Sequence, residues 1–222
     1  MPAYIKVWDP LVRVGHWTIV VAFVVAYLSG EELLSVHVWA GYVVGAAVLI
    51  RVIWGIIGPQ RARFSDFIYA PRAVLEYFAD LIRLRARRYL GHSPAGGAMV
   101  IALLVMLAGT VVTGLMNLGA DKHAGPLASF YASMPVGGPS ATPRGARGDG
   151  TREQAKEGEE SALRELHELF ANLTLILVGL HFAGVVLASV AHRENLVAAM
   201  ITGHKRGESE RPNLRAGSVM GR

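Results

Sequence analysis

The chain of 222 residues contains no cysteine. It therefore cannot form a disulfide, a thiolate metal site, an iron–sulfur cluster or the covalent haem attachment of a Cys-x-x-Cys-His motif. Charged residues are also scarce, at 18% of the chain, whereas a soluble domain has about 25%. Hydrophobic residues make up 52%. These values argue against an ordinary soluble domain, and any haem must be held without covalent bonds.

Four apolar stretches approach the length of about 20 residues that a helix needs to cross a membrane. The first follows Trp8-Asp9-Pro10 and lacks a small-residue cleavage site, so we interpret it as a retained helix and not as a signal peptide. The sequence thus predicts an all-α integral membrane protein, a four-helix bundle with up-down-up-down topology. One domain is expected over residues 1–206, followed by a polar tail over 207–222. The predicted helices cover residues 11–29, 36–58, 97–118 and 167–191.

The arginines predict the orientation of these helices. The connection 59–96 has seven arginines and three acidic residues, whereas the connection 119–166 has six basic and seven acidic residues. Because an excess of Lys and Arg marks cytoplasmic loops, we expect both termini in the cytoplasm and residues 119–166 outside. The net charge of +5 follows from this topology and does not indicate nucleic-acid binding.

The two longer connections differ in character. Residues 71–82 place Pro71 in a first turn, repeat apolar residues at helical spacing and precede a basic run over 83–88. They predict an amphipathic helix on the anionic inner leaflet, and a basic connector without that role is the alternative. Residues 119–166 are rich in Gly, Pro and charge and lack an apolar period. We expect a flexible loop that a partner orders.

Four histidines lie within the apolar stretches. His167 and His181 are fourteen residues apart, so on one helix they are separated by about 21 Å and fall about 40° short of four full turns. They therefore share a face at two depths, and ionisable groups at membrane depth usually mark a functional path. By depth, His16 pairs with His181 near the cytoplasm, and His37 pairs with His167 near the outside. Two facing imidazoles suit a six-coordinate b-type haem that transfers electrons.

Small residues near His37 agree with a flat cofactor. Gly41 and Gly45 follow His37 on the same helix face and would leave a groove for a macrocycle. The alternative is close helix packing, which a Gly-x-x-x-Gly pattern also favours.

Three arginines are candidate partners for haem propionates. Arg13 and Arg164 each precede a predicted ligand by three residues and lie on its face, and Arg51 interrupts an apolar run. Arginine binds carboxylates with two hydrogen bonds, although arginines at helix ends also extend their side chains to the membrane surface. The other histidines are expected to be solvated or interfacial, namely His92, His123, His192 and His204.

Several segments resemble the prokaryotic cytochrome b561 family, which includes the b-type subunits of nickel–iron hydrogenases. Residues 7–17, VWDPLVRVGHW, are similar to its opening motif, and residues 37–42, HVWAGY, to its second-helix motif. Residues 166–173 and 179–181 are similar to its fourth-helix motif. The resemblance implies two haems b, with the pairings given above, and exchange of electrons with ubiquinone or menaquinone in a bacterial inner membrane. Residues 138–160 are not matched to a hydrogenase-type subunit, which leaves the outer partner open.

The leading hypothesis is a di-haem cytochrome that joins the quinone pool to a periplasmic redox protein or a small oxidant or reductant. Within the same family, a stand-alone superoxide:quinone oxidoreductase is the alternative, so whether the chain is an enzyme stays open. No catalytic side chain is predicted, and a homodimer is left open. From another class, a histidine-based metal or ion transporter is the rival. Zinc favours converging imidazoles and carboxylates, which two separated pairs supply poorly.

Overall fold

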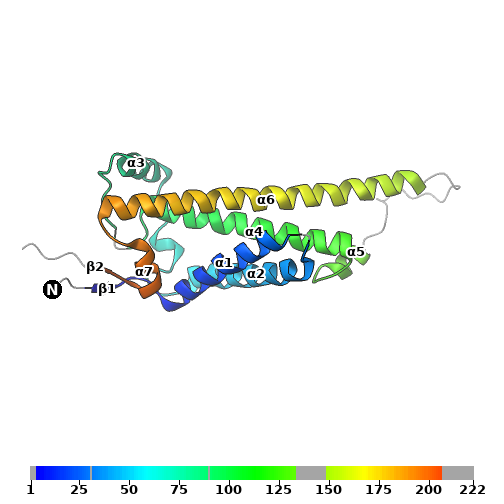
Figure 1. The fold of residues 1–222 in the computed structure, drawn as a ribbon, viewed down its shortest axis with the longest axis horizontal. Coiled ribbons are helices and arrows are strands. Elements are labelled where there is room, and N and C mark those ends of the chain that lie inside the picture. Colours follow the sequence, from blue (N-terminus) through cyan, green and yellow to red (C-terminus); the bar gives the residue numbers. More distant parts are fainter. Residues whose placement is uncertain (1–3, 31, 90, 134–148, 207–222) are drawn as a thin grey trace, which may run out of the picture.

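Four long helices dominate the computed structural model, which describes residues 4–30, 32–89, 91–133 and 149–206. Each is long and apolar enough to cross a membrane, which in the last helix applies to the part Ser161–His192. The four lie roughly side by side and form an elongated bundle (Figure 1). The predicted all-α membrane bundle is confirmed. Its helices are α1 (Pro10–Ser29), α2 (Leu34–Ile57), α4 (Pro94–Lys122) and α6 (Asp149–His192).

Local sequence explains where α1 and α4 begin. Asp9 caps α1, because its Oδ1 accepts hydrogen bonds from the backbone N–H groups of Leu11 (2.8 Å) and Val12 (3.3 Å). Ser93 caps α4 in the same way through Gly96. Both helices then begin with proline, which has no N–H to leave unpaired in the first turn.

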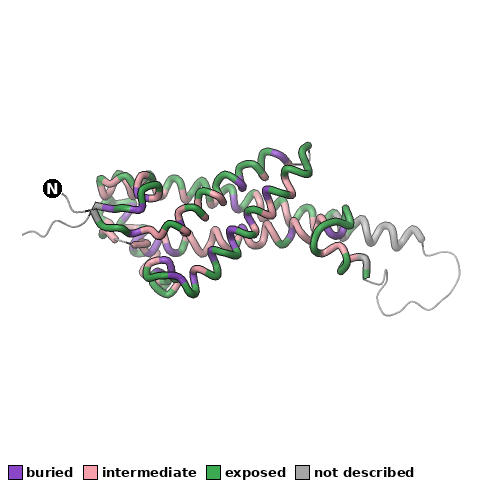
Figure 2. Tube along the Cα trace, turned by 90° about the horizontal axis from the view of Figure 1, so that it is seen from below, coloured by how far each residue is buried: buried purple, intermediate pink, exposed green. Residues whose placement is uncertain are grey.

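The four helices pack unevenly. Extensive contacts join α1 with α2 and α4 with α6, and a smaller contact joins α2 with α4. Among the described residues, the central apolar cluster comes from α1, α2 and α4 and includes none from α6. Much of the chain is exposed (Figure 2), and the exposed residues include large apolar ones such as Leu28, which is 79% exposed. An exposed apolar belt of this kind suits a lipid environment. The buried members of the cluster are Ala22, Phe23, Val44, Val48 and Leu107.

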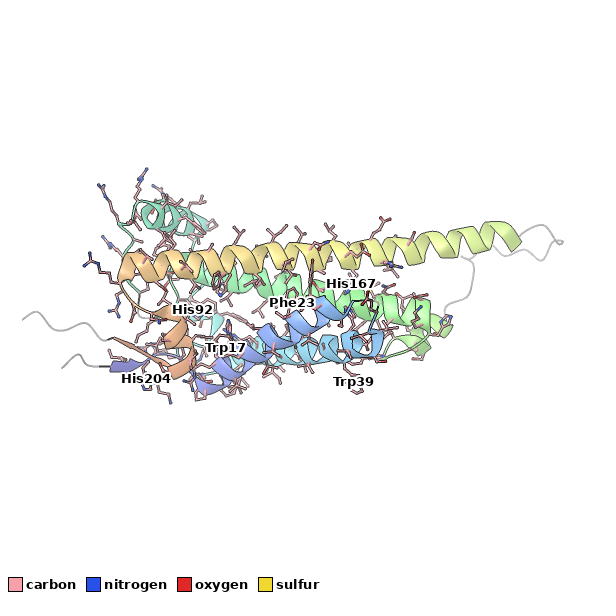
Figure 3. All side chains as sticks on the ribbon, in the orientation of Figure 1. Trp17, Phe23, Trp39, His92, His167 and His204 are labelled. Carbon is pink, nitrogen blue, oxygen red and sulfur yellow. The ribbon has the colours of Figure 1, made fainter. Side chains whose placement is uncertain are left out.

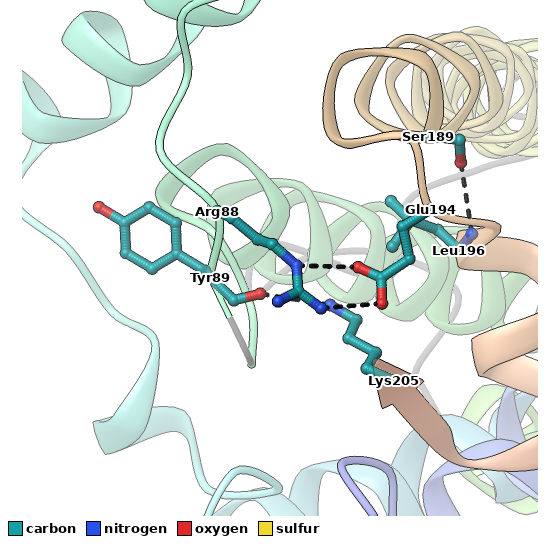
Figure 4. Close-up of polar contacts among 6 residues, drawn as sticks. All are labelled: Arg88, Tyr89, Ser189, Glu194, Leu196 and Lys205. Carbon is teal, nitrogen blue, oxygen red and sulfur yellow. Dashed lines mark hydrogen bonds and ion pairs between the residues drawn. The ribbon is translucent and has the colours of Figure 1, made fainter. Parts of the chain in front are cut away.

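Both ends of the described chain lie at one end of the bundle. Strand β1 (Tyr4–Lys6) pairs antiparallel with β2 (His204–Arg206), and the short helix α7 (Leu196–Thr202) precedes β2. The Lys205 ammonium donates to the Tyr89 carbonyl at 3.4 Å and fastens β2 to the loop before α4 (Figure 4). We call this the terminal end of the bundle and the opposite one the distal end.

The predicted amphipathic helix over residues 71–82 is confirmed as α3 (Pro71–Ile82), which follows the 3-10 turn η1 (Phe64–Asp66). Tyr77 and Leu81 are buried in a second cluster, which includes residues of α4 and α6. Leu75 and Ile82 remain about 70% exposed. The helix therefore anchors one face to the bundle and leaves other apolar side chains uncovered.

The connection 119–166 is more ordered than expected. Helix α4 continues to Lys122, the short helix α5 covers Ala128–Ser133, and α6 begins at Asp149. The expectation of a flexible loop is therefore wrong for these segments, whereas residues 134–148 and the predicted tail 207–222 lie outside the described residues. Residues 149–160 lack an apolar period, but eight of the twelve are Glu, Gln, Lys, Arg or Ala, which have high helix propensity. Such residues extend an existing helix at little cost, and α6 projects beyond the distal end as a result (Figure 1).

Candidate functional site

His37 and His167 face each other near the distal end of the bundle. His37 lies in the first turn of α2 and His167 on α6, and their ring centroids are 6.0 Å apart with an interplanar angle of 81°. Figure 3 shows the His167 side chain on the side of α6 that faces the other helices. Helix α2 packs mainly against α1 and α4, and its backbone is not closely packed against α6. The imidazoles of His37 and His167 therefore meet across a space between α2 and α6.

The ring separation fits two axial ligands of one metal ion. A bond between a metal and an imidazole nitrogen is about 2 Å long, and the nitrogen lies about 1 Å from the ring centre. Two imidazoles on opposite sides of one metal therefore have centroids about 6 Å apart. The observed 6.0 Å matches this value.

Hydrogen bonds hold both rings with the same nitrogen turned toward the backbone. His37 Nδ1 lies 2.8 Å from the Ala26 carbonyl oxygen, and His167 Nδ1 lies 3.0 Å from the Thr110 carbonyl oxygen. A carbonyl can only accept, so each Nδ1 carries the proton. The lone pair is then on Nε2, the nitrogen that is free to bind a metal.

A cavity of about 870 Å³ surrounds this pair. Gly41 lines it, and a β-carbon there would meet no other atom within 4 Å, so a flat ligand can approach the backbone. Gly114 lines the opposite wall on α4, where a β-carbon would lie 2.9 Å from Cε1 of His167. The cavity has the size of a cofactor site. Its polar lining includes Tyr27, Tyr42, Asn117, Asp121, Lys122, Ser161, Arg164, Glu168 and Asn172.

Gly45 is placed differently from Gly41. It does not line the cavity, and a β-carbon on it would lie 3.0 Å from Cγ1 of Val111 on α4. The absence of a side chain at Gly45 therefore allows α2 and α4 to pack closely, which was the alternative interpretation of the Gly-x-x-x-Gly pattern.

His16 and His181 form a second pair toward the terminal end. Their ring centroids are 6.4 Å apart with an interplanar angle of 57°. A β-carbon on Gly15 or Gly184 would meet nothing within 4 Å, so neither glycine is packed closely against another element. The structure thus brings together the same two histidine pairs that their depths in the sequence predict.

Buried polar atoms without a partner gather in the same half of the bundle. Within the described chain, they are Arg13 Nε, His16 Nδ1, Arg51 Nη2, Trp54 Nε1 and His92 Nδ1. Each belongs to the terminal half of its helix or to the adjoining loop. An unpaired buried donor costs about 1–3 kcal/mol, so this half suits a ligand with hydrogen-bond acceptors.

The three candidate arginines lie in different surroundings. Arg13 Nη1 donates to the Ile201 carbonyl at 2.9 Å. Arg51 is buried, donates to the Ala62 carbonyl at 3.1 Å and lies 5.1 Å from the centre of the Phe64 ring. Arg13 and Arg51 each hold neighbouring backbone and still have an unpartnered nitrogen for an anion. Arg164 lines the distal cavity and pairs with Glu168 at 3.4 Å on an exposed surface.

His92 lies in the loop just before α4 and is half-buried, not freely solvated. Its ring is packed between Trp8, with centroids 4.6 Å apart, and Phe67, with centroids 4.2 Å apart. Burial, with the nearby charges of Arg51 and Lys205, lowers the pKa of His92 to about 3. His123 caps the end of α4 and is exposed, as is His204 in β2. His192, the last residue of α6, has its Nε2 3.4 Å from the Tyr77 hydroxyl.

Sequence reasoning assigned no site residue to the third membrane helix, yet α4 forms one wall of the distal site. Thr110 and Gly114 both line the cavity, and Thr113 contacts His167. A signal was present, because two hydroxyls and two glycines interrupt the apolar run at 109–114, where small and polar residues favour helix contacts. The described residues contain no group of three or more His, Asp or Glu side chains that could hold a metal ion, so both sites rest on histidine pairs.

Comparison with known proteins identifies the family. The model of the prokaryotic cytochrome b561 family matches residues 7–203, which include every histidine of both pairs. The chain belongs to the prokaryotic cytochrome b561 family. The confirmed resemblance makes it a b-type cytochrome of membrane electron transfer, which agrees with two ring pairs at metal-ligand spacing.

Two similar proteins cover most of the cytochrome. A probable Ni/Fe-hydrogenase B-type cytochrome subunit of Rhodobacter capsulatus is 21% identical, over 93% of this chain and 83% of its own length. A protein of the same description from Azotobacter vinelandii is also 21% identical, over 94% of this chain and 91% of its own length. No solved structure matches the chain.

Proposed function

We propose that this cytochrome carries electrons across the bacterial inner membrane between the quinone pool and a redox partner at the distal face. Two haems b would take part, one held by His37 and His167 and the other by His16 and His181. The observation that carries the proposal is the separation of each ring pair, 6.0 and 6.4 Å, because one metal ion fits between such rings.

Each bound haem would supply a one-electron iron couple. The four histidines would provide two nitrogen ligands to each haem, a ligand set that serves electron transfer. The Nδ1 hydrogen bonds of His37 and His167 hold the rings in the orientation that such ligation needs. Rigid ligands of this kind favour electron transfer without a change in coordination.

Helix α6 connects the two sites. His167 and His181 are separated by about 21 Å along its axis, which divides the membrane into two shorter steps. Between these depths, Tyr27 on α1 donates to Asn172 Oδ1 on α6 at 3.2 Å. This contact joins α1, which bears His16, to α6, which bears His167 and His181.

Charged groups at both ends suit haem propionates. At the terminal end, Arg13 Nε and Arg51 Nη2 are buried donors for carboxylate oxygens. At the distal end, Arg164 and Lys122 line the cavity, together with Asp121 and Glu168. The two basic and two acidic side chains of the distal cavity balance each other, so they offer little electrostatic attraction for a small anion such as superoxide. This balance favours a redox protein as the partner.

We assign the terminal end to the cytoplasm. It carries the arginine-rich connection 59–96 and both described ends of the chain. The cavity around His37 and His167 then faces the periplasmic half of the membrane, which is the side from which a periplasmic donor would approach.

A difference spectrum of the purified full-length chain, dithionite-reduced minus oxidised, tests the proposal. We expect sharp b-type bands, two haems per chain by pyridine haemochrome assay, and reduction or oxidation by a quinone analogue. Colourless protein, or a single haem that survives replacement of either histidine pair, would contradict it.

A further inference from the structure

His167 has a second hydrogen-bond neighbour besides the Thr110 carbonyl. Its Nδ1 lies 3.2 Å from the Thr113 hydroxyl, and Thr113 is only 4% exposed. The hydroxyl oxygen also lies 2.8 Å from the Gly109 carbonyl and 3.1 Å from the Thr110 carbonyl. A hydroxyl has a single proton, and donating it to either carbonyl leaves its lone pairs for the Nδ1–H group of His167.

The terminal pair differs in this respect. Among the described residues, His16 Nδ1 is buried and has no hydrogen-bond partner, whereas His37 and His167 both donate from Nδ1. Hydrogen bonding at Nδ1 makes the opposite nitrogen a stronger electron donor to a metal. A stronger axial donor stabilises the oxidised iron and lowers the reduction potential of a haem.

We propose that Thr113 is a positioning residue for His167 and that its hydroxyl lowers the potential of the distal haem below that of the terminal haem. This inference rests on the proposed function, because it concerns haems held by the two histidine pairs. Thr113 acts through His167, the residue that would bind the haem.

A purely structural role for Thr113 predicts a different outcome. Thr174 on α6 provides the matched control, since its buried hydroxyl donates to the Phe170 carbonyl at 2.8 Å and lies 3.3 Å from the Thr110 hydroxyl on α4. Thr174→Val removes this contact between α4 and α6, and Thr174 is not among the residues that line the distal cavity. If helix packing alone matters, Thr174→Val and Thr113→Val should have the same effect.

The experiment is a potentiometric titration of both haems in the full-length protein and in Thr113→Val, Thr113→Ser and Thr174→Val. We expect Thr113→Val to raise one of the two midpoint potentials and leave the other unchanged. Loss of one hydrogen bond should raise this midpoint potential by up to about 59 mV, which corresponds to a tenfold change in the distribution of one electron between the haems. Thr113→Ser, which keeps the hydroxyl, and Thr174→Val should retain both original potentials.

A second measurement does not depend on the folding of Thr113→Val. Of the two potentials in the unmodified protein, the lower one should be missing in His37→Ala, and its retention would overturn the inference. Unchanged potentials in Thr113→Val, or an equal shift in Thr174→Val, would also overturn it. Absence of b-type bands in the unmodified protein would instead contradict the proposed function.

Discussion

Arg88 and Glu194 are joined by two parallel hydrogen bonds, from Nε to Oε2 at 3.2 Å and from Nη2 to Oε1 at 3.0 Å (Figure 4). Arg88 lies in the basic loop before α4, and Glu194 lies in the turn between α6 and α7. The side chains are 24% and 11% exposed, so solvent competes only weakly with the pair. Two segments more than a hundred residues apart in the chain are fastened at the terminal end in this way.

We therefore expect Glu194→Gln to destabilise the protein by about 2 kcal/mol, because charged hydrogen bonds in a partly buried site are lost. The midpoint of thermal unfolding in detergent should fall by about 4–8 °C. The matched control is Glu76→Gln, which breaks the exposed pair of Glu76 with Arg72 and should cost less than about 0.5 kcal/mol. Equal effects of the two substitutions would show that the Arg88 pair does not fasten the fold.

The two histidine pairs predict which substitutions remove the same haem. His37→Ala and His167→Ala should each lose one haem, and the spectrum and potential of the remaining haem should agree between the two variants. His16→Ala and His181→Ala should lose the other. Pyridine haemochrome assay and redox titration measure both properties. If His16→Ala and His167→Ala instead share a phenotype, the pairing inferred from ring distances is incorrect.

Filling the distal cavity should remove one haem without unfolding the bundle. Gly41→Leu places a large side chain where a β-carbon meets nothing within 4 Å, so the empty protein can accept it, whereas a bound macrocycle cannot. We expect Gly41→Leu to bind about half as much haem per chain as the unmodified protein. Ala46→Leu, on an exposed position of the same helix, is the control and should keep the full content. Full haem content in Gly41→Leu would place the cofactor elsewhere.

His92 should make the protein less stable in mild acid. Its pKa in the folded protein is about 3, whereas a histidine in the unfolded chain has a pKa of about 6.5. Between these values the unfolded state takes up a proton that the folded state does not, so stability decreases as the pH falls. From pH 7 to pH 5 the loss is about 2 kcal/mol.

Replacing His92 by Leu should remove this part of the pH dependence. The thermal unfolding midpoint of His92→Leu should therefore rise relative to that of the unmodified protein as the pH falls from 7 to 5. His204→Leu, at an exposed position in β2, controls for the loss of a histidine as such. A constant difference between His92→Leu and the unmodified protein across this range would mean that His92 does not cause the acid sensitivity.

The membrane helices and histidine pairs could be predicted because they depend on regular properties of the sequence. Apolar length sets the number of spans, and helical rise sets the depths of His167 and His181. The role of Thr113 could not be predicted, since it depends on how α4 rotates against α6. The burial of His92 depends on contacts with Trp8 and Phe67, which approach only when distant segments fold together.

The start of α6 shows another limit of sequence patterns. Residues 149–160 have no apolar face that would indicate a helix, and they become helical as a continuation of a segment stabilised by packing. The separate roles of Gly41 and Gly45 illustrate the same limit. Both positions suit a groove in the sequence, but only the arrangement of α2 and α4 decides which glycine faces space and which faces Val111.

Because His167 and His181 belong to a single uninterrupted helix, their relative direction depends on the number of residues between them. Each inserted or deleted residue would turn one imidazole by about 100° relative to the other and away from its partner. The intervening segment can therefore tolerate many side-chain changes but no change in length. A one-residue insertion near Leu175 should disable one site even though every ligand, glycine and arginine is still present.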